Sequence, residues 1–168
     1  IALMDFKPEN MVYCLSHGHA VATWKAIDFD NSRHFGEEVA KAATPEYASY
    51  EMARHMLDGD SAVSLKADPA MDICSLGWTV WVIFNNGVSL WDMLGLTTKT
   101  STHAARREQE HRILAKLASM TQSELLQHIN ATFADDTSVH SALRRFLPKL
   151  LHVDPRLRLQ ANQLRTAT

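Results

Sequence analysis

A short run near the start of the chain carries three side chains that could act on a phosphate group. The run is Asp5-Phe6-Lys7-Pro8-Glu9-Asn10, with a lysine two residues after the acid and an asparagine three residues later. A carboxylate can take the proton of an attacking hydroxyl, an ammonium group can meet a phosphate as a point charge, and an amide oxygen can bind Mg²⁺. Because so short a spacing can arise by chance, its meaning depends on the elements that position it.

The composition is that of one ordinary globular domain. The 168 residues are 46% hydrophobic and 21% charged, and the formal net charge of −2 argues against a protein that coats nucleic acid or an anionic membrane, so we expect neither as a partner. The apolar run from Trp78 stops at Asn85, which is too short for a membrane span. Cys14 and Cys74 offer no disulfide framework, and no signal peptide is visible, so buried thiols in a cytoplasmic protein are expected.

Residues 11–29 predict two strands around a turn. Residues 11–15 and 22–27 are rich in β-branched and aromatic side chains, and residues 16–19 are typical of a turn. A hairpin here would bring Asp28 back beside Asn10, and the two would offer oxygen ligands for Mg²⁺. The histidines of the turn, His17 and His19, could instead form a metal pair. Nothing nearby supplies a third ligand, so an exposed turn is the better interpretation.

Most of the remaining chain predicts helices. Continuous apolar character over residues 71–84 predicts a helix in the middle of the core, with its tryptophans in core packing rather than on a ligand shelf. Residues 104–119 are amphipathic, Thr121 and Glu124 predict a capping box that opens a helix through residue 133, and residues 159–168 begin a last helix. A helix over residues 138–152 should kink or end at Pro148. Its expected inward side chains are Leu143, Phe146, Leu147, Leu150 and Leu151.

Five blocks in order give the chain a resemblance to eukaryotic protein kinases of the serine/threonine type. Residues 5–10 are similar to the end of the H-R-D-L-x-x-x-N catalytic loop, and residues 28–30, Asp-Phe-Asp, follow as the metal-binding motif. Residues 43–51 resemble G-T-P-E-Y-x-A-P-E, residues 72–77 resemble D-x-W-S-x-G, and residues 152–158 resemble D-P-x-x-R. Together the blocks are far more specific than any one of them.

The resemblance implies transfer of the γ-phosphoryl group of ATP, with Mg²⁺, to a hydroxyl of a protein substrate. It implies that Asp5 is the catalytic base and that Lys7 neutralises charge on the γ-phosphate. Thr44 would hydrogen-bond to this pair and favour a serine or threonine acceptor. The residues it places on the nucleotide and metal are Lys7, Glu9, Asn10 and Asp28, with Asn10 and Asp28 as the metal ligands.

The resemblance also implies three supporting residues. Glu51 and Arg158 would form a buried ion pair that pins the activation segment to the helical lobe. Asp72, at the start of the central helix, would accept backbone N–H groups of the catalytic loop and hold it rigid.

The implied fold is mainly α, the C-terminal lobe of an α+β parent fold with a small β-hairpin. Residues 1–168 would be a partial kinase domain with the catalytic loop at 1–10, the activation segment at 28–51 and the central helix at 72–86. The N-terminal lobe, with its G-x-G-x-x-G loop, would precede Ile1 and would be an expected partner.

Several departures from the family pattern bear on activity. Leu3-Met4 replaces the His-Arg pair whose arginine meets a phosphorylated residue, and residues 33–43 contain no Ser, Thr or Tyr. We therefore expect an enzyme that is not switched by activation-loop phosphorylation. Asp30 replaces the usual glycine, and residues 52–71 are a polar insertion with no evident function.

Two other functions remain open. The departures at Asp30 and Leu3-Met4 fit a pseudokinase or scaffold. Such a binding module does not need all four of the retained residues, which are Asp5, Lys7, Asn10 and Asp28. A phosphotransferase acting on small molecules would share the catalytic acid and metal ligands. The peptide-platform block at residues 44–47 argues against it.

Overall fold

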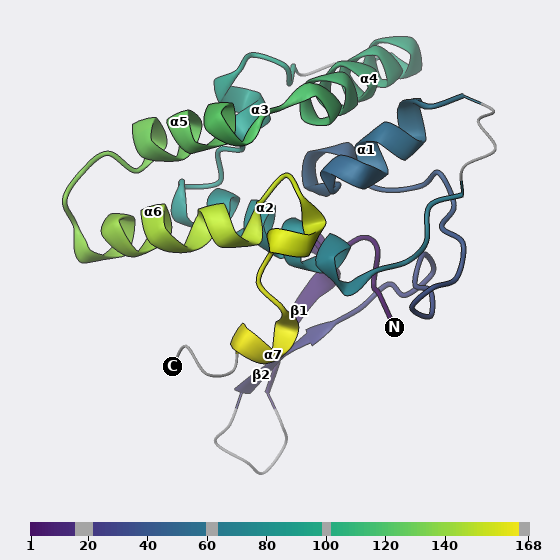
Figure 1. Ribbon diagram of the computed structural model, residues 1–168, viewed down its shortest axis with the longest axis horizontal. Coiled ribbons are helices and arrows are strands. Elements are labelled where there is room, and N and C mark those ends of the chain that lie inside the picture. Colours follow the sequence, from purple (N-terminus) through teal and green to yellow (C-terminus); the bar gives the residue numbers. More distant parts are fainter. Residues whose placement is uncertain (16–21, 60–63, 99–101, 165–168) are drawn as a thin grey trace.

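Helices dominate the chain, as predicted, with one antiparallel hairpin in the part that the structure describes (Figure 1). The computed structural model describes residues 1–15, 22–59, 64–98 and 102–164. The elements are η1 (Pro8–Asn10), β1 (Met11–Leu15), β2 (Ala22–Ala26), η2 (Pro45–Tyr47), α1 (Tyr50–Leu57), α2 (Pro69–Phe84), α3 (Leu90–Met93), α4 (His103–Ser119), α5 (Gln122–Thr132), α6 (Ser138–Leu150), η3 (Pro155–Leu157) and α7 (Ala161–Leu164). Among the described residues, no helix combines the length and the apolar character of a membrane span.

Helix α2 lies at the centre of the core. It begins at Pro69, earlier than predicted, because the Asp68 side chain accepts the Ala70 N–H and proline fits the first turn of a helix. Trp78 and Trp81 are 2% and 0% exposed, which confirms that they pack in the core. Their ring centroids are 6.2 Å apart.

The helices around α2 follow the predicted pattern with local corrections. Thr121 caps α5 by accepting the Glu124 N–H at 3.2 Å, but the Glu124 carboxylate pairs with Lys116 of α4, so the reciprocal half of the expected capping box is not formed. Helix α6 stops at Leu150 instead of residue 152, two residues after Pro148. Phe146, predicted to point inward, is only half-buried. Part of the expected polar insertion at residues 52–71 is α1, which packs against α4.

The predicted hairpin is present and stands out from the helical body (Figure 1). Its strands pair from Met11 opposite Ala26 to Leu15 opposite Ala22. Strand β2 ends one residue earlier than expected, and the histidine turn at residues 16–19 lies outside the described residues. The Ile27 N–H donates to the Asn10 carbonyl at 2.9 Å, so the chain leaving β2 runs beside the end of η1.

The two cysteines are not equivalent. Cys74 is fully buried in α2, and this burial raises the pKa of its thiol to about 12. The thiol therefore stays protonated and behaves as a small apolar group, as predicted. Cys14 on β1 is only half-buried, which corrects the expectation that both thiols are buried.

A buried ion pair joins helix α1 to the C-terminal part of the chain. Arg158 and Glu51 pair through both guanidinium branches, at 2.7 and 2.8 Å, and the Arg158 side chain is 0% exposed. The same guanidinium donates to the carbonyls of Ala70 and His152, each at 2.8 Å. The contact that the resemblance implies is thus present, and its charge is satisfied on three sides.

Arg158→Met should strand the Glu51 carboxylate in this site. Removing one partner of a buried pair costs about 3–5 kcal/mol, so the free energy of unfolding in urea should fall by that order. Arg156→Met is the control, because Arg156 pairs with Asp154 from an 85% exposed position and its loss should change stability little. Equal effects of the two substitutions would contradict the assignment of the buried pair.

Gly77→Ala should also destabilise the fold, although alanine is the better helix former. A Cβ at Gly77 would lie 2.7 Å from Leu151 Cδ2 and 3.0 Å from Leu150 Cβ, where α2 meets the end of α6. Overpacking costs about 1–3 kcal/mol, more than the gain of about 1 kcal/mol in helix propensity. Urea unfolding should show a net loss for this variant and almost none for Gly59→Ala, whose added Cβ meets open space.

Candidate active site

The first residues of the chain are fixed on the start of α2. The Asp72 carboxylate accepts the Leu3 N–H at 2.7 Å and the Met4 N–H at 2.9 Å. Met4 adopts a φ of 69°, a left-handed conformation that a non-glycine residue keeps only where its surroundings hold it. Met4 is itself 5% exposed, so the segment before Asp5 is held by both packing and hydrogen bonds.

Asp5, Lys7 and Thr44 form one hydrogen-bonded group. The Lys7 ammonium donates to Asp5 Oδ2 and to Thr44 Oγ1, both at 2.7 Å. The Thr44 N–H donates to Asp5 Oδ1 at 3.2 Å. Two segments 37 residues apart in sequence therefore meet at one carboxylate and one ammonium group.

Asn10 completes the loop from the other side. Its Nδ2 donates to the Asp5 carbonyl at 2.9 Å and to Asp5 Oδ2 at 3.4 Å, and the residue is 8% exposed. Because the amide nitrogen is engaged with Asp5, the orientation of the side chain is fixed, and its oxygen is the atom left to act as a ligand.

Asp28 is placed differently from these residues. Its neighbour Ile27 is hydrogen-bonded to the Asn10 carbonyl, so the Asp28 backbone lies next to the catalytic-type loop. Its φ is 61°, and it is exposed. Asp28 does not line the cavity to which Lys7, Glu9 and Asn10 contribute. The structure thus brings together four predicted residues, Asp5, Lys7, Asn10 and Thr44, and leaves Asp28 beside them at the end of the hairpin.

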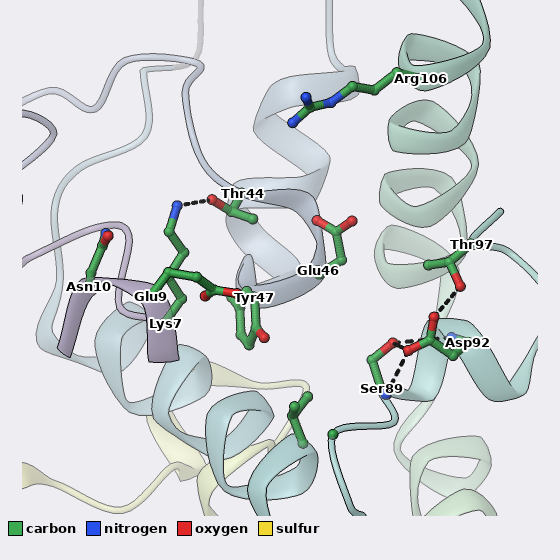
Figure 2. A pocket seen from close by; sticks show the side chains of 12 residues that line it. Lys7, Glu9, Asn10, Thr44, Glu46, Tyr47, Ser89, Asp92, Thr97 and Arg106 are labelled. Atoms are coloured by element: carbon green, nitrogen blue, oxygen red, sulfur yellow. Dashed lines mark hydrogen bonds between the residues drawn. The ribbon is translucent and has the colours of Figure 1, made fainter. Parts of the chain in front are cut away.

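A cavity of about 580 Å³ opens beside this group. Figure 2 shows Lys7 and Thr44 on one side, Asp92 with Ser89 and Thr97 on the other, and Glu46 between them. Asp92 was not predicted as a site residue. Its Ser-x-x-Asp spacing to Ser89 predicts only the capping box that is formed at α3. Nothing local in the sequence signals that α3 faces η2 across a cavity.

Burial and hydrogen bonds shift the pKa values of three ionisable side chains that line the cavity. Burial raises the pKa of Glu46, and burial together with the charges of Glu9 and Glu46 raises the pKa of Tyr47 to about 12. Burial alone would raise the pKa of Asp92, but hydrogen bonds from Ser89 and Thr97 hold it below its ordinary value. At neutral pH the cavity therefore contains an ionised Asp92 and a neutral Tyr47 phenol.

Asp5 is poised as a charged carboxylate. Burial alone would raise its pKa, but hydrogen bonds from Lys7 and Thr44 and the Lys7 charge together hold the pKa of Asp5 below its ordinary value. Because the folded-state pKa is depressed, these contacts stabilise the fold above the ordinary pKa of a carboxyl group. That stabilisation is lost as the pH falls through the folded-state pKa.

Mg²⁺ is commonly held by one or two protein oxygen ligands while substrate phosphates and waters fill its remaining positions. Of the two predicted ligands, Asn10 has its amide oriented beside Asp5, whereas Asp28 is exposed and does not line the cavity. Within the described ranges, no group of three or more His, Cys, Asp or Glu side chains is arranged as a metal site. An all-protein metal cage is therefore not formed by that part of the chain.

Lys7→Met should raise the pKa of Asp5. The substitution removes a hydrogen bond and a positive charge that favour the ionised carboxylate, while burial, which favours the neutral form, remains. Carboxyl ¹³C NMR titration of Asp5 checks this, with Lys25→Met on the exposed face of β2 as the control. An Asp5 pKa that is the same in wild type and Lys7→Met would show that the ammonium group does not act on this carboxylate.

Comparison with protein-family models identifies the family of the chain. The family model of the protein kinase domain matches residues 1–167, which is nearly the whole chain. No curated protein matches the chain. The matched span contains the Asp5 group, the Asp72 contact and the Glu51–Arg158 pair. The chain therefore belongs to the protein kinase domain family.

Proposed function

We propose that the chain carries the catalytic residues of a protein serine/threonine kinase, which transfers the γ-phosphoryl group of ATP to a protein hydroxyl. The observation that carries the proposal is the position of the Lys7 ammonium, 2.7 Å from both Asp5 and Thr44. Family membership supports a transferase. The geometry around Lys7 supports the finer assignment to serine and threonine acceptors, because Thr44 joins the acid and the lysine that would meet the acceptor.

Each residue of the group has a distinct role in the proposed reaction. Asp5 orients the acceptor hydroxyl and accepts its proton, since its carboxylate is ionised, half-buried and hydrogen-bonded to Lys7 and Thr44, which line the cavity. Lys7 holds positive charge beside the reacting centre. Thr44 fixes Lys7 and, through its N–H, the second oxygen of Asp5. None of these side chains has to move far to act, which is the benefit of a preorganised site.

Asn10, Asp28 and Glu9 would hold ATP and Mg²⁺ together with Lys7. Bound ATP supplies the phosphoryl group, and Mg²⁺ neutralises charge on its phosphates. On the protein side, Asn10 is oriented by its hydrogen bonds to Asp5, whereas Asp28 is exposed beside it. The protein substrate, an N-terminal lobe in the parent chain and a cytoplasmic location remain parts of this proposal.

The pseudokinase alternative is supported by specific residues. Asp30 and Met4 stand where active members of the family have other side chains, and Met4 is buried where an arginine would be needed to meet a phosphate. The intact hydrogen-bonded group around Asp5 favours the active enzyme, because a scaffold has no need of an ammonium group shared between an acid and a threonine.

Asp5→Asn should reduce phosphoryl transfer at least about 100-fold, because the amide cannot accept the acceptor proton. Transfer of γ-labelled phosphate to a generic protein substrate measures it, on the chain with whatever upstream residues its parent protein carries. Asp136→Asn is the matched control, since the Asp136 side chain is 100% exposed and pairs only weakly with Arg144, at 3.4 Å.

The fold of Asp5→Asn must be verified in the same experiment. Its thermal midpoint should stay close to that of wild type, because Asp5 is only half-buried and an amide can keep part of the hydrogen bonding. Equal, measurable transfer by wild type and Asp5→Asn would contradict the role of Asp5 as the base. If wild type and Asp5→Asn were equally inert and both had normal midpoints, the enzyme would be rejected and the scaffold favoured.

A further inference from the structure

The activation segment of this chain is paired with the residues that follow α1. Residues 36–39 lie antiparallel to residues 65–67, which we term the strap, and Glu38 lies directly opposite Lys66. Three backbone hydrogen bonds join the segments: Gly36 N–H to the Ala67 carbonyl at 2.9 Å, Ala67 N–H to the Glu37 carbonyl at 2.8 Å, and Val39 N–H to the Leu65 carbonyl at 2.9 Å. The strap belongs to the polar insertion to which the sequence analysis assigned no function.

Val39 is the most firmly held residue of this pairing. Its N–H donates to the strap, its carbonyl oxygen lies 3.2 Å from His55 Nε2 on α1, and its side chain is 9% exposed in the core. Both backbone polar groups and the side chain are therefore satisfied at once. The Glu38–Lys66 ion pair adds little, since its atoms are 3.7 Å apart and both side chains are exposed.

The strap is the second of four tethers along the activation segment. Before it, Arg33 exchanges two backbone hydrogen bonds with Ala2, at 2.8 and 3.0 Å. After it, the Lys41 ammonium donates to the Asp58 and Gly59 carbonyls. Thr44 is then hydrogen-bonded to the Asp5 group. Between Arg33 and Thr44, the segment is thus bound to other parts of the same chain every few residues.

These tethers use no phosphate. Residues 33–43 contain no hydroxyl side chain, and Met4 offers no positive charge to a phosphate group. Backbone hydrogen bonds to the strap need neither. Each is worth about 1 kcal/mol when formed between shielded groups, and a set of them acting together can hold a segment in place.

We propose that the strap is a built-in positioning element, which holds the activation segment so that Thr44 stays on Asp5 and Lys7 without phosphorylation. Ala67 and Leu65 are then positioning residues that act through Val39 and Thr44. The significance of this element for catalysis rests on the proposed kinase function, but the coupling between the strap and Thr44 is a property of the fold and can be tested separately.

Ala67→Pro tests the coupling, with Ala67→Val as the matched control. Proline removes the Ala67 N–H that donates to the Glu37 carbonyl. Valine is similar in size to proline but keeps this N–H. The measurement is hydrogen exchange, resolved by NMR, on the phosphatase-treated full chain. The amides of Gly36 and Val39 report the strap, the amide of Thr44 reports the active site, and the amide of Arg33 is the reference for opening elsewhere.

In Ala67→Pro the amides of Gly36, Val39 and Thr44 should exchange about tenfold faster, which corresponds to the loss of one shielded hydrogen bond. Arg33 should be unchanged, and Ala67→Val, which adds bulk at a buried position but keeps the N–H, should accelerate Thr44 exchange clearly less than Ala67→Pro does. Faster exchange at Gly36 and Val39 with an unchanged Thr44 would overturn the proposal. Equal acceleration in both variants, or at all four amides, would also overturn it, because the effect would then come from packing or global destabilisation.

A disulfide rescue makes the test independent of how well Ala67→Pro folds. Glu38 and Lys66 are a directly opposed antiparallel pair whose flanking residues carry the hydrogen bonds, a position where Cα atoms lie about 4.5 Å apart and a disulfide fits. Glu38→Cys with Lys66→Cys in the Ala67→Pro background should restore slow exchange at Thr44 when oxidised and lose it when reduced. A formed disulfide that leaves Thr44 exchange fast would contradict the proposal. Hydrogen exchange does not depend on catalytic turnover. An inert wild type would therefore reject the kinase assignment, while exchange at Thr44 would still test the coupling between the strap and Thr44.

Discussion

The Asp72 carboxylate accepts two backbone N–H groups from residues 69 and 68 positions earlier in the chain, and the rest of the site depends on this contact. It fixes Leu3 and Met4 on α2, whose own position is set by core packing around Trp78. Asp5 follows directly, so its carboxylate is presented to Lys7 and Thr44 from a rigid base. Without that base, the loop would be tied to the activation segment only by the Ala2–Arg33 pairing and by the contacts of Asp5 and Lys7 with Thr44.

Long-range polar contacts also hold the activation segment, on both sides of Thr44. The Glu51–Arg158 pair anchors the chain just after Thr44, and the strap anchors it just before. Thr44 is therefore held between two anchors, one a buried ion pair and one a backbone ladder. A buried pair and a ladder are both costly to break partially, which favours one arrangement of the segment over many.

Residues with a side-chain signature could be predicted from the sequence. The hairpin and the core helix follow from residue pattern, whereas the Asp72 contact and the Glu51–Arg158 pair were predicted only through the family resemblance. The strap could not be predicted, because its hydrogen bonds come from backbone groups that nearly every residue carries. The position of Asp92 in the cavity wall could not be predicted either, because it depends on how α3 packs. The helix α1 was missed although it has a local signal in the sequence, since Ser49 caps it by accepting the Met52 N–H at 3.3 Å. The half-buried position of Phe146 depends on tertiary packing.

The proposed role of the Asp5, Lys7 and Thr44 group is to direct phosphate to serine or threonine hydroxyls of a protein. Phosphoamino-acid analysis measures this: the parent protein is incubated with magnesium, γ-labelled ATP and a mixed protein substrate, and the substrate is then hydrolysed. Label is expected in phosphoserine and phosphothreonine. Label confined to phosphotyrosine or to small molecules, or no incorporation by a folded wild-type protein, would contradict it.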